Sequence, residues 1–213
     1  MNELIIETAT VAFATFFATI GPADVAAMYA ALTSRATPKH RRQMAVRAVL
    51  IAGSILIVFA LIGDFLLSSL GISLAALRTA GGILLLLIGI DMVFARHSGG
   101  TSTTDEEEQE ALSKRDISVF PIATPLIAGP GALGAVILLM ANAEDDISLQ
   151  IAVIAALLLV LLITLTMLLL ASSLQKLLGV TGMQVISRIF GVLLSALAIQ
   201  FVFDGIAQSG LLS

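Results

Sequence analysis

Two Gly-Pro pairs in the 213-residue sequence are its clearest candidates for solute chemistry. Gly21-Pro22 and Gly129-Pro130 each lie near the middle of a long apolar stretch. Proline lacks an amide proton and clashes with the carbonyl group four residues earlier, so a helix kinks or breaks there. At membrane depth the freed main-chain groups need other partners, and a bound solute is one of them. A packed kink without a ligand is the alternative interpretation.

Polar and helix-breaking residues surround both pairs. Asp24 falls in the first turn of the helix that resumes after the first pair, where it either caps the positive end of the helix dipole or binds a cation, a proton or a substrate amine. Pro121, Thr124 and Pro125 precede the second pair and reinforce the interruption. The candidate solute-binding residues are therefore Gly21, Pro22, Asp24, Thr124, Pro125, Gly129, Pro130 and Gly131.

Four charged residues stand at the ends of apolar stretches. Asp64 and Arg78 flank the short turn 71–73, at similar depths on neighbouring predicted helices. Asp91 and Arg188 have a similar arrangement near the opposite membrane face. Charges at membrane depth are costly unless they are paired or reach the interface. We therefore expect structural ion pairs or snorkelling side chains, and a moving gate built from these pairs is the alternative.

The composition requires a membrane environment. Hydrophobic residues make up 58% of the chain, charged residues make up 12%, and the mean hydropathy is +1.06. A soluble domain has about 25% charged residues, so a water-soluble enzyme is excluded. The formal charge of −4 argues against nucleic acid as a partner. With no cysteine in the chain, disulfides and cysteine-based zinc sites are excluded too.

Six apolar stretches are long enough to cross a bilayer, which takes about 20 residues. A lipid-facing main chain must satisfy its own hydrogen bonds, and the alternation typical of a β-barrel is absent from the sequence. We therefore predict an all-α membrane protein with six transmembrane helices, the first and fourth broken at Gly-Pro. The stretches are 8–32, 48–70, 74–95, 117–141, 149–171 and 185–207.

The connections between these stretches differ in charge. All nine of their Lys and Arg residues fall in the first, third and fifth connections. The positive-inside rule makes that side cytoplasmic. Both termini are then expected outside the cytoplasm.

The two halves of the sequence resemble each other. The Gly-Pro pairs lie 108 positions apart, and the segments 78–81 and 188–191, each running from Arg to Gly before an apolar run, lie 110 positions apart. Because three is odd, a second three-helix copy must cross the membrane in the opposite sense, as in many secondary transporters. The predicted units are a first three-helix repeat, 1–96, a cytoplasmic acidic linker, 97–116, and a second inverted repeat, 117–213.

The sequence has no motif of an enzyme, an ATPase or a metal site. A nucleophile elbow, a zinc-protease motif, a P-loop and a dinucleotide fingerprint are all missing. His40 and His97 stand beside basic or flexible residues, so a metal site built from them is not expected. We expect no catalytic residue and no cofactor. The linker 97–116 is most simply a solvated, self-repelling acidic segment, with a regulatory contact as the alternative.

Three segments carry a resemblance to a known family. PIATPLIAGPGAL at 121–133, LRTAGGILLLLIGIDMVFA at 77–95 and RIFGVLLSALAIQFVFDGI at 188–206 resemble the MarC family. PLIAGPG is the most specific motif, and the resemblance covers nearly the whole chain. It implies six spans, a bacterial or archaeal inner membrane, and a place in the LysE-like group of small transporters. Some members of the family are described as neutral amino-acid transporters.

The first break departs from the family pattern. Where relatives have an NPxGN-like stretch, this sequence has Gly21-Pro22-Ala23-Asp24-Val25. Both asparagines are therefore missing, and Asp24 replaces the glycine. If those asparagines bind a solute or an ion in relatives, the solute differs here, and the carboxylate favours a proton or a cationic group.

These features predict a secondary transporter or exporter of a small polar solute, with a neutral amino acid suggested by the resemblance. The site would lie between the two broken helices, with H⁺ or Na⁺ as a coupling ion. Substrate, direction and oligomeric state stay open. The alternative is a non-transporting structural or regulatory membrane protein that recruits partners through 97–116. Deleting that segment separates the two, because a scaffold would lose its function and a transporter would keep it.

Overall fold

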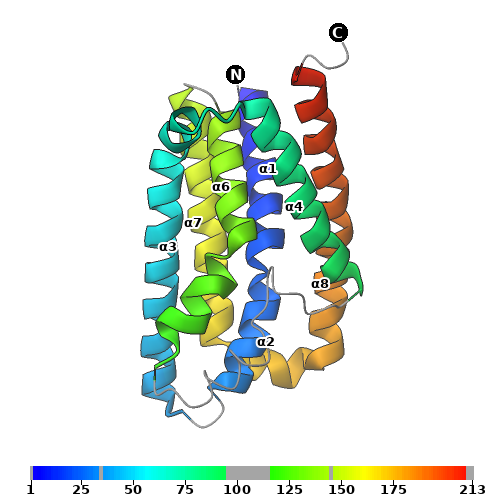
Figure 1. The fold of residues 1–213 in the computed structure, drawn as a ribbon. Coiled ribbons are helices and arrows are strands. Elements are labelled where there is room, and N and C mark those ends of the chain that lie inside the picture. Colours follow the sequence, from blue (N-terminus) through cyan, green and yellow to red (C-terminus); the bar gives the residue numbers. More distant parts are fainter. Residues whose placement is uncertain (1, 34–35, 95–115, 144–145, 210–213) are drawn as a thin grey trace.

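The part of the chain that the computed structural model describes is a bundle of helices without strands (Figure 1). It comprises residues 2–33, 36–94, 116–143 and 146–209, with only the main chain described at several positions, including 64, 130 and 172–184. The helices are α1 (Asn2–Ile20), α2 (Pro22–Leu32), α3 (Pro38–Ser69), α4 (Leu74–Phe94), η1 (Ser118–Ile127), α6 (Pro130–Asn142), α7 (Ile147–Leu169) and α8 (Ala171–Gln208).

Five of the described helical segments are long and apolar enough to span a bilayer. They are Glu3–Ala30, Pro38–Gly63, Ala75–Phe94, Ile147–Leu169 and Arg188–Gln208. A sixth span results if Ser118–Ile127 and Gly131–Asn142, which meet at 53°, cross as one. Apolar side chains also cover the outside of the bundle, with exposed fractions above 70% at Leu61 and Phe65. The prediction of an all-α membrane protein is confirmed, with five to six spans.

The helix α3 begins ten residues before the predicted stretch at 48. Pro38 takes the first helical position, where its missing amide is not needed. The main-chain amide of His40 donates to Oγ1 of Thr37 at 3.4 Å, as expected of an N-cap. Lys39 and Arg47 therefore belong to a helix and not to a loop, which corrects the predicted boundary. Capping signals outweighed hydropathy here.

A tight turn joins α3 to α4. The amide of Ile72 donates to the carbonyl of Leu67 at 2.9 Å across Gly71, which has a φ of +68°. This is the bond of a Schellman C-cap. Oγ of Ser73 then accepts from the amide of Ala76 at 3.2 Å and caps α4. The two helices therefore reverse direction within a few residues, as the sequence predicted for the turn 71–73.

The helices α4 and α8 pack antiparallel at backbone contact distance (Figure 1). A Cβ atom placed on Gly89 would lie 2.9 Å from the carbonyl oxygen of Gly191, and one on Gly205 would lie 2.7 Å from the amide of Thr79. Membrane helices approach this closely where small residues line the interface. The glycines therefore hold α4 against α8 by shape.

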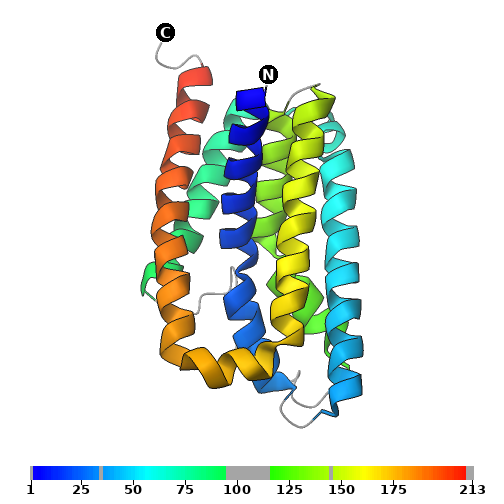
Figure 2. The same cartoon turned by 180° about the vertical axis from the view of Figure 1, so that it is seen from behind.

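The start of α1 and the end of α8 lie at one end of the bundle, and the basic start of α3 lies at the other (Figure 1). The first turns of α8 cross that second end before the helix runs the length of the bundle (Figure 2). Residues 171–184 are thus helical and continuous with the last span, whereas the sequence predicted a separate connection.

Candidate functional site

The first Gly-Pro pair separates α1 from α2. Gly21 has a φ of +58°, a left-handed conformation in which glycine avoids the steric cost that other residues pay. Its amide still donates to the carbonyl of Phe17 at 3.0 Å, and its own carbonyl accepts from the amide of Val25 at 3.0 Å. The interruption is therefore one residue long, and Pro22 begins the next helix.

Asp24 lies in the first turn of α2 and its side chain is exposed. A Cβ atom placed on Gly21 would lie 3.3 Å from Oδ2 of Asp24, so the carboxylate folds back over the interruption. A negative charge at this end of a helix is stabilised by the helix dipole. The carboxylate thus stands at a capping position and is accessible. This arrangement suits both of its predicted roles, which are capping the helix and binding a cation, a proton or a substrate amine.

The helix that follows the second Gly-Pro pair begins in the same way as the helix that follows the first. Gly129 is extended, with φ −83° and ψ 175°, and stands at the N-cap of α6, with Pro130 as its first residue. The carbonyl of Gly129 accepts from the amide of Leu133 at 2.9 Å. This bond is the counterpart, 108 positions later, of the Val25–Gly21 bond. The side chain of Pro130 lies outside the described residues.

The segment before the second pair is not an α-helix. Within η1, Phe120 and Thr124 have extended dihedral angles, and the amide of Ala128 donates five residues back, to Ala123 at 2.8 Å. Oγ1 of Thr124 donates to the carbonyl of Val119 at 3.2 Å. The half-buried Pro125 lies inside this segment. Thr124 and Pro125 therefore shape the main chain that leads into the second interruption.

The two interruptions lie next to each other. A Cβ atom placed on Gly131, in the first turn of α6, would lie 3.8 Å from Cβ of Thr19 and 2.4 Å from Cδ1 of Ile88. Thr19 is in the last turn of α1, and Ile88 comes from α4. The sequence analysis did not select Thr15 or Thr19, although their spacing of one helical turn just before Gly21 is visible in the sequence. The structure shows that both are buried.

Both buried threonine hydroxyls bond to their own helix. Oγ1 of Thr19 donates to the carbonyl of Thr15 at 2.8 Å, and Oγ1 of Thr15 donates to the carbonyl of Val11 at 2.8 Å. An aromatic contact also joins this part of α1 to α8, because the ring centroids of Phe17 and Phe190 are 4.2 Å apart. The last turns of α1 therefore lie against α6 at Thr19 and against α8 at Phe17.

The four charged residues predicted to pair have different surroundings. Nε of Arg78 donates to Oδ1 of Asn142 and so ties α4 to the end of α6. The side chain of Asp64 lies outside the described residues, so its pairing with Arg78 stays a prediction. Asp91 is half-buried on α4, and Arg188 is exposed on α8. Their pairing also stays a prediction.

Two contacts that the sequence analysis missed tie other segments to the start of α3. Nη1 of Arg47 lies 2.6 Å from Oδ2 of Asp116, just before η1. Ser118, whose amide donates to Oδ1 of Asp116 at 2.9 Å, and the Arg47 guanidinium hold the pKa of Asp116 below its ordinary value. The hydroxyl of the buried Tyr29, in α2, donates to the carbonyl of Arg41. The ion pair joins residues 69 positions apart, so no local sequence pattern predicts it.

Among the residues that the structure describes, no three His, Cys, Asp or Glu side chains gather in a way that could hold a metal ion. The arrangement instead consists of main-chain interruptions, hydroxyls and one accessible carboxylate. The fold and these features together define a multi-pass helical membrane protein.

Comparison with known proteins identifies the family. The sequence model of the MarC family integral membrane proteins matches residues 6–209. A UPF0056 membrane protein of Methanocaldococcus jannaschii is 39% identical over 195 residues, 92% of this chain and 94% of its own length. The UPF0056 membrane proteins YhcE of Escherichia coli and YvbG of Bacillus subtilis are 33% and 30% identical, covering 91% of this chain and 89% and 92% of their own lengths.

The chain belongs to the MarC family of integral membrane proteins. The resemblance found in the segments 77–95, 121–133 and 188–206 is thereby confirmed. The names of these relatives state a membrane protein and no substrate or enzymatic activity. No solved structure matches the chain.

Proposed function

We propose that this protein is a secondary transporter or exporter of a small polar solute, with neutral amino acids as the first candidates. The observation that carries the proposal is the contact between the two interruptions, where Gly131 of α6 packs beside Thr19 of α1. Transporters with inverted repeats bind their solutes between such interrupted helices. At the first interruption, the site would include Gly21, Pro22 and Asp24.

The packing of the two halves supports an inverted repeat. The helix α1 of the first half packs against α7 of the second half. The equivalent contact in the other direction joins η1 and α6 of the second half to α3 of the first half. Likewise α1 and α2 contact α8, and α6 contacts α4. Several contacts of one half thus have counterparts in the other. Such an interlocked pair of units can rock about a shared centre, as alternating access requires.

The chemistry of the two helix starts supports a zwitterionic solute. Asp24 stands in the first turn of α2, and the position 108 residues later is Ala132 in α6. The start of α2 therefore carries a carboxylate that suits an ammonium group. The start of α6 has no acidic residue in its first turn, so its amides and dipole suit a carboxylate. An amino acid has both groups.

We also propose roles for the remaining predicted residues. Asp24 is the group through which H⁺ or Na⁺ would couple to transport, because a carboxylate binds either. Asp64, Arg78, Asp91 and Arg188 would form the gates near the two membrane faces. The basic end of the bundle would face the cytoplasm of a cell with this protein in its inner membrane, leaving both termini outside.

Uptake by proteoliposomes tests the proposal. The purified chain is reconstituted, and a panel of radiolabelled neutral L-amino acids is presented with a proton or sodium gradient. At least one amino acid should accumulate, and Asp24→Asn should lower its uptake or change the pH dependence of uptake. Asp204→Asn is the matched control, because Asp204 accepts from Gln200 of its own helix at 2.9 Å, far along α8. Equal effects of both variants, or no accumulation of any amino acid, would contradict the proposal.

A further inference from the structure

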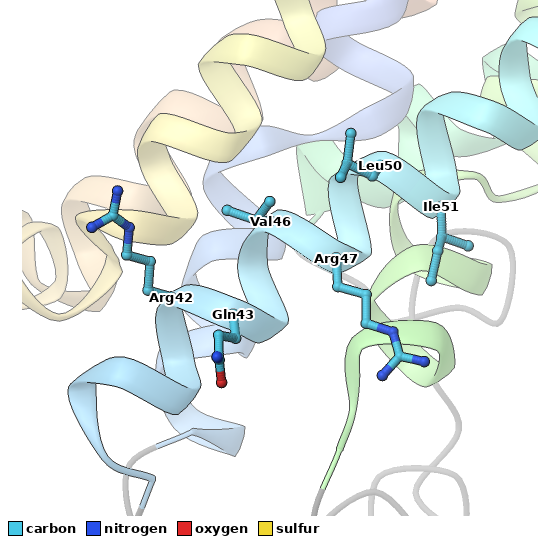
Figure 3. Close-up of a pocket in the computed structure, with 6 residues that line it drawn as sticks. All are labelled: Arg42, Gln43, Val46, Arg47, Leu50 and Ile51. Carbon is cyan, nitrogen blue, oxygen red and sulfur yellow. The ribbon is translucent and has the colours of Figure 1, made fainter.

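A groove of about 630 Å³ runs along one face of α3 near the beginning of the helix (Figure 3). Its lining residues follow the spacing of two neighbouring ridges on one helix face, four positions apart within each ridge. They are Arg42, Gln43, Val46, Arg47, Leu50 and Ile51. The groove therefore belongs to the surface of the bundle at the start of the span Pro38–Gly63.

The polarity of this groove changes along the helix. Arg42 and Gln43 stand at the end nearer the helix start and are exposed. Leu50 and Ile51 stand about 12 Å further along, at a rise of about 1.5 Å per residue, and Leu50 is 65% exposed. A charged end near the start of the candidate span and an apolar end further along it match the polarity of a phospholipid.

The two arginines of the groove differ in their electrostatic surroundings. Arg47 extends toward η1 in Figure 3, and its charge is offset by Asp116 at 2.6 Å. Arg42 is exposed, and the exposed Lys39 lies one turn before it on the same helix. The polar end of the groove is therefore positive. A guanidinium is well suited to bind a phosphate group.

We propose that this groove binds an anionic phospholipid, with its phosphate at Arg42 and an acyl chain along Val46, Leu50 and Ile51. The site is separate from the solute site, and it does not depend on transport. Basic residues beside a membrane span are a recurrent way to hold anionic lipids. The bound lipid would cover Leu50 and stabilise the start of α3 against the rest of the bundle.

Photo-crosslinking in nanodiscs of phosphatidylcholine tests the proposal on the full chain. The probe is a photoactivatable phosphatidylglycerol, and adducts are mapped to peptides by mass spectrometry. Adducts should form on the peptide that carries 43–57, and unlabelled phosphatidylglycerol should compete better than phosphatidylcholine of the same chains. Arg42→Gln should reduce that preference about fivefold, the effect of one charge near a membrane surface. Arg42→Lys should keep most of it, and Arg188→Gln, an equal charge change on α8, should leave it unaltered.

Other occupants give different results. Competition by glycerol phosphate as strong as that by phosphatidylglycerol would identify a site for soluble anions and overturn the lipid assignment. Labelling only after the acidic residues of 105–110 are changed to amides would mean that this segment occupies the groove, and would overturn the proposal. Equal competition by the two lipids, or equal losses in Arg42→Gln and Arg188→Gln, would overturn it as well. Thermal unfolding of each variant verifies that the compared proteins are folded.

Discussion

The two Gly-Pro pairs have the same sequence and the same hydrogen bond at the helix that follows, yet the chain enters them differently. Before Gly21 an α-helix continues to Ile20, and a single left-handed residue separates it from α2. Before Gly129 the ten residues of η1 include two with extended dihedral angles, and the path bends by 53°. The dipeptide therefore determines how a helix starts again, and the preceding residues determine how far it is interrupted.

Proline content explains the difference. The segment before the second pair contains Pro121 and Pro125, each of which removes an amide donor, whereas residues 2–20 contain no proline. The two helix starts also differ in charge, with Asp24 in one and Ala132 at the corresponding position of the other. The two interruptions thus differ in both shape and charge, as the proposed binding of an asymmetric solute would require.

The largest expected difference is between the two proline substitutions. Pro22→Ala restores an amide where only Gly21 interrupts the helix, and a helix interior favours Ala over Pro by about 3 kcal/mol. If the solute needs the interruption, its affinity falls by up to about a hundredfold. Pro130→Ala leaves η1 in its non-α conformation, so we expect a loss below about tenfold. Equilibrium binding of the transported amino acid to proteoliposomes measures both, and equal losses would remove the distinction.

The second comparison concerns the stability of the two glycine positions. Gly21→Ala forces a side chain into the left-handed region, which costs about 1–2 kcal/mol. Gly129→Ala keeps allowed dihedral angles, and the weaker N-cap preference of alanine should cost less, about 0.5 kcal/mol. Unfolding in mixed detergent, followed by circular dichroism, gives both free energies of unfolding. An equal cost at both positions would mean that the two backbones do not differ as described.

The third comparison concerns the contacts that anchor the interrupted segments to α3. Tyr29→Phe removes the hydroxyl that donates to the carbonyl of Arg41, and loss of one such bond costs about 1 kcal/mol. Thr10→Ala is the control, because its exposed hydroxyl donates only within its own helix, to Ile6. The free energy of unfolding is measured as above. Equal values for the two variants would argue against an anchoring role of Tyr29.

The smallest expected effect belongs to the ion pair of Asp116 with Arg47. Exposed pairs contribute about 0.2–1 kcal/mol, so Asp116→Asn should destabilise by no more than that at neutral pH. Because the pKa of Asp116 is lowered on folding, its contribution is present at neutral pH and is lost on acidification through the folded pKa. The difference in unfolding free energy between wild type and variant should therefore shrink at acidic pH and in high salt. A difference independent of pH would contradict the assignment.

Much of the fold could be predicted because a membrane helix is recognisable from the apolar residues of its own segment. The all-helical class, the family and the short turn 71–73 followed from apolar length, motif and a glycine. The basic start of α3 was mistaken for a loop, because a hydropathy window ignores the N-cap at Thr37 and the proline that follows it. The helical segment 171–184 was missed for a related reason, since it lies across the end of the bundle and is too polar to register as a span.

The sequence by itself determined which segments are apolar helices and where proline deprives them of a hydrogen bond, because both properties reside in single residues and their immediate neighbours. The tertiary structure alone decided that Gly131 meets Thr19, that Arg78 bonds to Asn142, and that Asp116 reaches Arg47. These contacts join residues more than 60 positions apart. They depend on how the helices pack in three dimensions, and hydrophobicity, which has no direction, does not encode that packing.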